Sequence, residues 1–244
     1  MATATKEIQG QAKTVIELLG VKYAVDYYQR EYKWEMKQVQ ELIEDLTTSF
    51  LDSYHEDHPR SAVKHYGRYF LGSVIISRKD GDNFIVDGQQ RLTSLTLLLI
   101  FLNNLQRGRS EQVHIDHLIH SEEYGTKSFN LDVPKRLDAM NALYENQPFD
   151  ASNEEESVRN IVSRYRDIEE LFPSELAGDA LPYSIDWLIR NVHLVEIAAF
   201  SDEEAYTIFE TMNDRGLSLT PTEMLKGFLL AKIDDEHKKT AANE

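Results

Sequence analysis

Five consecutive residues carry the side chains best suited to chemistry in this chain: Asp87, Gly88, Gln89, Gln90 and Arg91. Amides offer both donors and acceptors, a guanidinium forms a fork that fits phosphate, and a carboxylate can hold Mg²⁺ or orient a water. If a helix begins here, its free backbone N–H groups and its dipole also favour an anion. These residue types therefore favour a phosphate or nucleotide site.

A simpler structural interpretation accounts for part of the pattern. Asp87 can cap the helix, with Gln90 three residues later as in a capping box, and the polar first turn is then solvated surface. We favour the ligand site because two amides and a guanidinium stand directly before a helix that is apolar nearly all round.

Two strands and one long helix must position this turn. Residues 84–86 are aromatic or β-branched and suit a buried strand, and a turn signal before them predicts a hairpin with a strand at 69–77. Residues 92–105 carry leucines at helical spacing and further apolar residues on the other faces. This helix should therefore be buried, with Leu98 and Leu102 in the core.

Two further polar stretches stand far from this turn in the sequence. Residues 28–34 combine three aromatics with a glutamine and an arginine, which suits either the core or a base-binding pocket. Asn213 and Arg215 can form a second polar turn of the site, or belong to a plain helix stop, which Gly216 alone would explain.

Three blocks of the sequence resemble the N-terminal domain of GmrSD-type, modification-dependent restriction systems. Residues 87–91 are similar to that family's DGQQR motif, and residues 28–34 are similar to its early YQR-x-Y-x-W block. Residues 209–226 are similar to its late F-x-x-x-N-x-RG…L…LLK block. The blocks stand in the family's order, and the resemblance covers residues 15–232.

The resemblance implies an α+β fold of the ParB/sulfiredoxin-like kind, with a small mixed sheet packed on a long buried helix. It also implies a regulatory domain that binds and hydrolyses nucleoside triphosphates, with Mg²⁺, in a modification-dependent DNA restriction system directed against phage. Nuclease activity would belong to a separate HNH-type domain or subunit, and contact with DNA to the full assembly. The implied site residues are Asp87, Gln89, Gln90 and Arg91 as catalytic groups, Asp87 as metal ligand, and Gln29, Arg30, Gly88, Asn213 and Arg215 as nucleotide-binding groups.

Composition narrows the class of protein. The 244 residues are 41% hydrophobic and 28% charged, which is typical of a soluble globular protein. There is no cysteine, no secretory signal and no apolar run long enough to span a membrane, so we expect a cytoplasmic protein without disulfides or a membrane role. The sequence is compatible with a homo-oligomer but does not indicate one.

The net charge and the absence of a standard phosphate-binding loop also narrow the possible functions. The net charge of −16 argues against tight, non-specific DNA binding by this chain alone. It therefore weakens the alternative function, a non-enzymatic ParB-like module that senses modified DNA. No stretch reads as a Walker A loop, so the nucleotide interpretation depends on the helix terminus and on the resemblance.

No repeat or linker divides the chain clearly. We expect a nucleotide-binding core from residues 14–107 and 192–232, with a mostly helical insertion at 108–191. The charged residues 233–244 should form a disordered tail, and the small, polar residues 1–12 should be frayed.

Two groups of histidines invite a metal interpretation. His55 and His58 lie in a polar loop that offers no further ligand spacing. His114, His117 and His120 stand at intervals of three, but on a helix they would drift away from a shared face. A metal site is therefore the weaker interpretation of both groups.

Overall fold

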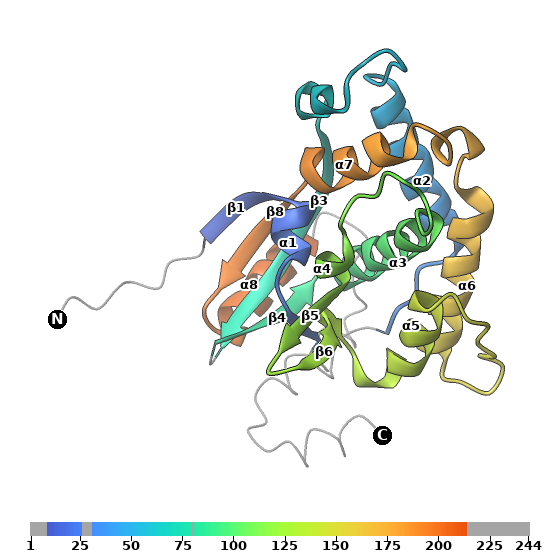
Figure 1. The fold of residues 1–244 in the computed structure, drawn as a ribbon. Coiled ribbons are helices and arrows are strands. Elements are labelled where there is room, and N and C mark those ends of the chain that lie inside the picture. Colours follow the sequence, from blue (N-terminus) through green and yellow to red (C-terminus); the bar gives the residue numbers. More distant parts are fainter. Residues whose placement is uncertain (1–8, 26–30, 80, 214–244) are drawn as a thin grey trace.

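The computed structural model describes residues 9–25, 31–79 and 81–213, in which a six-stranded mixed sheet has helices on both faces (Figure 1). The order of its strands is β1-β8-β3-β4-β2-β7, and a separate hairpin consists of β5 and β6. Sheet and helices together confirm the α+β fold class. The strands are β1 Gln9–Thr14, β2 Tyr23–Val25, β3 Tyr69–Lys79, β4 Asp82–Asp87, β5 His120–Glu123, β6 Thr126–Phe129, β7 Leu131–Asp132 and β8 Val192–Ala199.

The helix α3, Gln89–Leu105, is the centre of the main core (Figure 1). Leu98 and Leu102 are each 3% exposed, which confirms the prediction from the leucine pattern. Helix α6 packs against both α2 and α3, while α8 covers the opposite face of the sheet. The other helices are α1 Val15–Leu19, α2 Met36–Leu51, α4 Asp116–Ile119, α5 Leu137–Tyr144, α6 Glu156–Leu171, α7 Leu181–Asn191 and α8 Asp202–Asn213, with short 3-10 turns at Arg60–His65, Pro134–Arg136 and Ser174–Leu176.

The hairpin predicted before the motif is present. β3 and β4 pair antiparallel, with Ser77 opposite Phe84 and Lys79 opposite Asp82. The register shifts between Ile75 and Ile76, next to the end of β4. Such irregularities often lie beside functional sites, because they change the direction of a strand and its side chains.

The expectation of a frayed segment at residues 1–12 is wrong for its last part. Residues 9–14 form β1, which pairs antiparallel with β8 along its whole length. The side chain of Lys13 also forms an ion pair with the buried Glu196, at 2.8 Å. Backbone pairing and this ion pair hold an edge strand that has no apolar pattern, so its sequence gave no signal.

The segment 108–191 shares a core with the rest of the described chain. Its strand β7 pairs parallel with β2 in the main sheet. Ile161 of α6 and Leu188 of α7 belong to the same cluster of buried residues as Leu98. The division into a core and an insertion remains a prediction, and the predicted tail lies outside the described residues.

Candidate functional site

Three neighbouring strands place the motif at the side of the sheet where their carboxyl ends lie. β4, β2 and β7 lie side by side and run parallel, so their carboxyl ends meet at the same edge. β4 ends at Asp87, and Val25 at the end of β2 lies opposite Ile85. Ligands in open sheets commonly bind outside the carboxyl ends of parallel strands, where α3 also begins.

Gly88 makes the turn from β4 into α3. Its φ of +91° is left-handed, and a Cβ on it would lie 2.6 Å from Cγ1 of Val74. Leu92 N donates to Gly88 O at 3.0 Å, which is the first bond of the helix. Only glycine fits this position without strain.

The alternative interpretation, in which Asp87 caps α3, is not what the structure shows. Gly88 is the N-cap residue, and among the described residues no side chain caps this end of the helix. The start of α3 therefore keeps the polarity that attracts an anion.

The side chain of Arg91, in the first turn of α3, lies against β3. Its Nη1 donates to the carbonyl oxygen of Ser73, and its Nη2 lies 3.8 Å from Oδ2 of Asp87. The guanidinium passes over Gly72, where a Cβ would come within 2.7 Å of Nη1. The Arg91 side chain remains 27% exposed and Asp87 33% exposed, so both groups can still meet a ligand.

The two glutamines of the motif differ in their surroundings. Gln89 is buried in the protein, at 6% exposure. Gln90 is less buried, and its amide reaches residues 31–34, the second half of the early aromatic block. Its Oε1 accepts from Lys33 N at 2.9 Å and Trp34 N at 3.3 Å, and its Nε2 donates to Glu31 O at 2.8 Å. The sequence did not distinguish the roles of these two amides.

The early aromatic block contributes to the core. Tyr32 is fully buried, and its hydroxyl lies 2.9 Å from Oγ of Ser94 on α3. Burial raises the pKa of Tyr32 to about 12. Trp34 is partly buried against the same core. The core interpretation is therefore correct for these two aromatics, whereas Tyr28, Gln29 and Arg30 lie outside the described residues.

Helix α8 runs toward the motif from the other face of the sheet. It begins just after β8, which ends at Ala199 opposite Ser77 of β3. Its buried residues then pack on Ile75, which lies opposite Asp87. The helix ends at Asn213, so its C-terminal end points to the sheet edge at which Asp87 lies. Arg215 lies outside the described residues.

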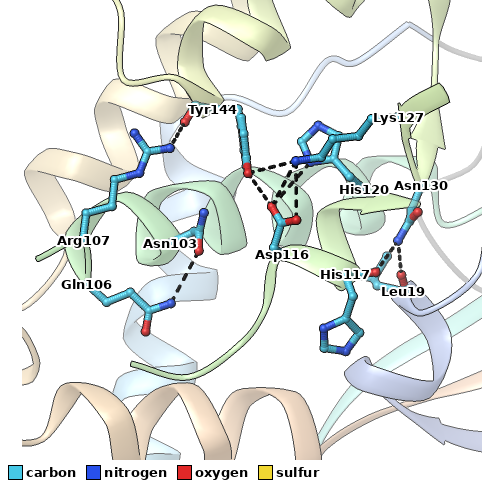
Figure 2. Close-up of polar contacts among 10 residues, drawn as sticks. All are labelled: Leu19, Asn103, Gln106, Arg107, Asp116, His117, His120, Lys127, Asn130 and Tyr144. Carbon is cyan, nitrogen blue, oxygen red and sulfur yellow. Dashed lines mark hydrogen bonds and ion pairs between the residues drawn. The ribbon is translucent and has the colours of Figure 1, made fainter. Parts of the chain in front are cut away.

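Of the three histidines at 114–120, His120 belongs to a separate polar cluster with Asp116, Lys127 and Tyr144 (Figure 2). Asp116 accepts hydrogen bonds from the Tyr144 hydroxyl and from Lys127, and Nδ1 of His120 lies 3.9 Å from its Oδ1. His117 points away from this carboxylate. No group of three or more potential metal ligands occurs among the described residues, so the histidines give no support to a metal site.

The electrostatics of this cluster follow from its burial. Desolvation lowers the pKa of His120 to about 4; Lys127 lowers it further and Asp116 opposes the shift. Burial alone would raise the pKa of Asp116, but its bonds from Tyr144 and Lys127 lower it overall. The cluster thus holds a neutral imidazole beside an ion pair, and it fastens the β5–β6 hairpin to α5.

The fold and the motif define a class: an α+β domain whose conspicuous polar motif lies at a helix N-terminus, beside the carboxyl ends of parallel strands. A family model described as "GmrSD restriction endonuclease, N-terminal domain" matches residues 10–230. The chain therefore belongs to this family, which places it in a restriction endonuclease system. No curated protein matches it. Within the part of the chain that the structure describes, no helix combines the length and apolar character that crossing a membrane requires.

Proposed function

We propose that this chain binds and hydrolyses nucleoside triphosphates at the start of α3, as the regulatory domain of a modification-dependent restriction system that acts against phage DNA. The observation that carries the proposal is the N-terminus of a buried helix that no side chain of the described residues caps, with Arg91 in its first turn. An uncapped helix start binds phosphate oxygens through its backbone N–H groups, and a guanidinium adds a charged fork.

The residues around this helix start have separate proposed roles. Arg91 holds phosphate charge, and Gly88 lets the phosphates approach the backbone. Asp87 suits Mg²⁺, because its carboxylate is partly exposed and its contact with Arg91 is long, at 3.8 Å. Mg²⁺ is commonly held by one or two carboxylates together with substrate phosphates, so one carboxylate fits. When bound, the ion would neutralise charge on the phosphates.

Hydrolysis joins the oxygen of a water to the terminal phosphorus and breaks the bond from that phosphorus to the bridging oxygen, which releases nucleoside diphosphate, inorganic phosphate and a proton. Gln89 and Gln90 belong to the motif that we propose to support this step. Gln29 and Arg30 follow β2, which ends beside β4. Asn213 ends α8, and Arg215 stands two residues later. These four residues complete the proposed nucleotide site.

The proposed setting is the cytoplasm, with an HNH-type nuclease domain or subunit as partner and with DNA bound by the full assembly. In this setting, nucleotide turnover controls cleavage of modified DNA. The acidic balance of the chain, −16, supports the assignment of DNA contact to the assembly rather than to this domain.

Calorimetry with ATP, GTP, CTP and UTP, each with and without Mg²⁺, tests the proposal, and phosphate release tests turnover. Arg91→Ala should weaken binding about tenfold or more, the scale of one charged hydrogen bond. Arg91→Lys keeps the charge but loses the fork, so its binding should be intermediate. Arg190→Ala is the matched control, because it removes a 58%-exposed arginine of α7 and should leave binding unchanged.

Two outcomes contradict the proposal. A folded wild-type chain that binds none of the four triphosphates overturns it. Mobility shifts of modified and plain duplexes at low salt test the alternative, a DNA-sensing module. Retention of DNA by the isolated chain without nucleotide, lost in Arg91→Ala, would instead assign the motif to a backbone phosphate of DNA.

A further inference from the structure

Strand β3 departs from regular pairing where it passes the motif. On the side of β8, the register shifts between Phe70 and Ser73, so the two residues between them face one residue of β8. On the side of β4, the pairing ends with Ile75 opposite Asp87. Such irregularities are common next to active sites, where they redirect a side chain. Residues 71–74, the irregular stretch of β3, therefore lie beyond the end of β4, beside the turn into α3.

Within this stretch, Gly72 lies directly against the Arg91 guanidinium. Its φ is +108°, a left-handed conformation that favours glycine. An added Cβ would lie 2.7 Å from Nη1 of Arg91, and the next nearest atoms, at 3.4 and 3.9 Å, are Cζ and Nε of the same side chain. The three nearest neighbours of that Cβ thus all belong to one guanidinium. Arg91 therefore occupies the space that a side chain at position 72 would need.

The carbonyl oxygen of Ser73 holds the same guanidinium. Arg91 Nη1 donates to it, while Nη2 lies 3.8 Å from Oδ2 of Asp87. Because β4 ends opposite Ile75, no residue of β4 pairs with Ser73, and the arginine bonds to the backbone there in place of a strand. An arginine that is held before a ligand arrives loses less conformational entropy when it binds phosphate.

Val74, the next residue of β3, determines the other glycine of this region. A Cβ on Gly88 would lie 2.6 Å from its Cγ1, so the turn into α3 is packed against β3. Three consecutive residues of the irregular stretch thus meet the motif: Gly72 gives Arg91 its space, Ser73 bonds to it, and Val74 packs against Gly88.

We propose that Gly72 is a positioning residue of the nucleotide site, because it lets the Arg91 guanidinium lie on β3 and reach Ser73 O. This inference rests on the proposed function, in which Arg91 holds phosphate charge. A guanidinium has five N–H donors, and the Ser73 carbonyl takes one of them. The Arg91 side chain is 27% exposed, so other donors can meet phosphate oxygens. A side chain at position 72 would displace the guanidinium and change the direction of these donors.

Gly72→Ala tests this role without changing the motif. It should weaken binding of the triphosphate that binds wild type most tightly, with Mg²⁺, by about fivefold, because the guanidinium is displaced but not removed. In an Arg91→Ala background, Gly72→Ala should have no further effect on the Kd, since the atoms that its Cβ displaces are gone. It should still lower the Tm in that background, because a φ of +108° remains unfavourable for alanine.

Gly81→Ala is the matched control. Gly81 lies in the hairpin between β3 and β4 with a φ of +97°, and a Cβ there would meet nothing within 4 Å. This variant should lower the Tm and leave the Kd unchanged. Wild-type affinity in a folded Gly72→Ala variant, an equal loss in Gly81→Ala, or an undiminished loss in the Arg91→Ala background overturns this inference alone. A wild type that binds no triphosphate overturns the proposed function and this inference together.

If Gly72→Ala does not fold, NMR of the wild type without nucleotide replaces it. The Nη hydrogens of Arg91, assigned by their loss in Arg91→Lys, should give separate signals, because the bond to Ser73 O hinders rotation of the guanidinium. Arg190 of α7, whose side chain is 58% exposed, supplies the reference for free rotation. Averaged signals like those of Arg190 would show that β3 does not hold the Arg91 guanidinium, and they would overturn the role of Gly72.

Discussion

Gly88 shows how a single residue determines the chemistry available at the motif. Its left-handed conformation and its contact with Val74 exclude every side chain, and they leave α3 without a side-chain cap. A capping carboxylate would satisfy the N–H groups that a phosphate needs. The glycine therefore keeps this helix terminus open to a ligand, whereas Asp87 interacts with Arg91 instead.

Gly88→Ala should destabilise the protein by about 2 kcal/mol or more, which urea unfolding monitored by circular dichroism measures. The added Cβ is strained at a φ of +91° and would lie 2.6 Å from Val74 Cγ1. Left-handed strain costs about 1–2 kcal/mol, and overpacking adds about 1–3 kcal/mol.

Gly108→Ala provides the matched control. Gly108 also has a positive φ, of +78°, but a Cβ there would meet nothing within 4 Å. This variant should show only the cost of the left-handed conformation, about 1 kcal/mol. Equal losses in the two variants would show that Val74 does not enforce the glycine at position 88.

At the scale of elements, the apolar patterns of the sequence predicted the helix and the strands that lie in the core. The leucines of α3 and the β-branched residues of β4 are buried, and the turn signal between β3 and β4 specified their pairing. These features depend on neighbours along the chain, so periodicity is sufficient to find them.

The elements that the sequence did not reveal depend on distant partners. β1 is an exposed edge strand that depends on β8, and Lys13 of β1 is bonded to Glu196 of β8, 183 residues away in the sequence. The bonds of Gln90 lie with residues 31–34, and those of Asn160 lie 128 residues away at Tyr32. No local pattern carries such pairings, so the hydrogen bonds from α6 to residues 31–34 were missed.

The β5–β6 hairpin should be fastened less strongly at low pH. His120 has a pKa of about 4 in the folded chain, below its ordinary value of 6.5. Because the folded pKa is depressed, the stability from the neutral ring is present above pH 6.5 and is lost as the pH falls toward 4. Its contribution should fall by about 1–2 kcal/mol between pH 7 and pH 5.

His120→Phe removes this titration and retains an aromatic ring between Phe129 and Tyr144. The unfolding free energy, measured in urea at pH 7 and pH 5, should therefore fall less in the variant than in wild type when the pH is lowered. His117→Phe is the control, because His117 is exposed. An equal pH dependence in all three proteins would exclude His120 as its source.

At the scale of the whole molecule, one core joins the two predicted parts of the chain. The main cluster of buried residues includes α2 and α3 from residues 14–107 and α6 and α7 from residues 108–191. The Trp187 ring lies 5.9 Å from that of Phe50 on α2, measured between centroids. The backbone of Trp34 is bonded to Arg164. Side chains of the two parts are therefore buried against each other in one core.

The described chain should therefore unfold in a single transition. The sequence has two tryptophans, and each lies in a different predicted part: Trp34 in residues 14–107 and Trp187 in residues 108–191. Variants Trp34→Phe and Trp187→Phe each leave one reporter. In each variant, the urea midpoint from tryptophan fluorescence should equal that from circular dichroism, because neither part keeps a core without the other. A Trp187 signal that changes at a different midpoint from the circular dichroism of the same sample would show that residues 108–191 fold as a separate unit.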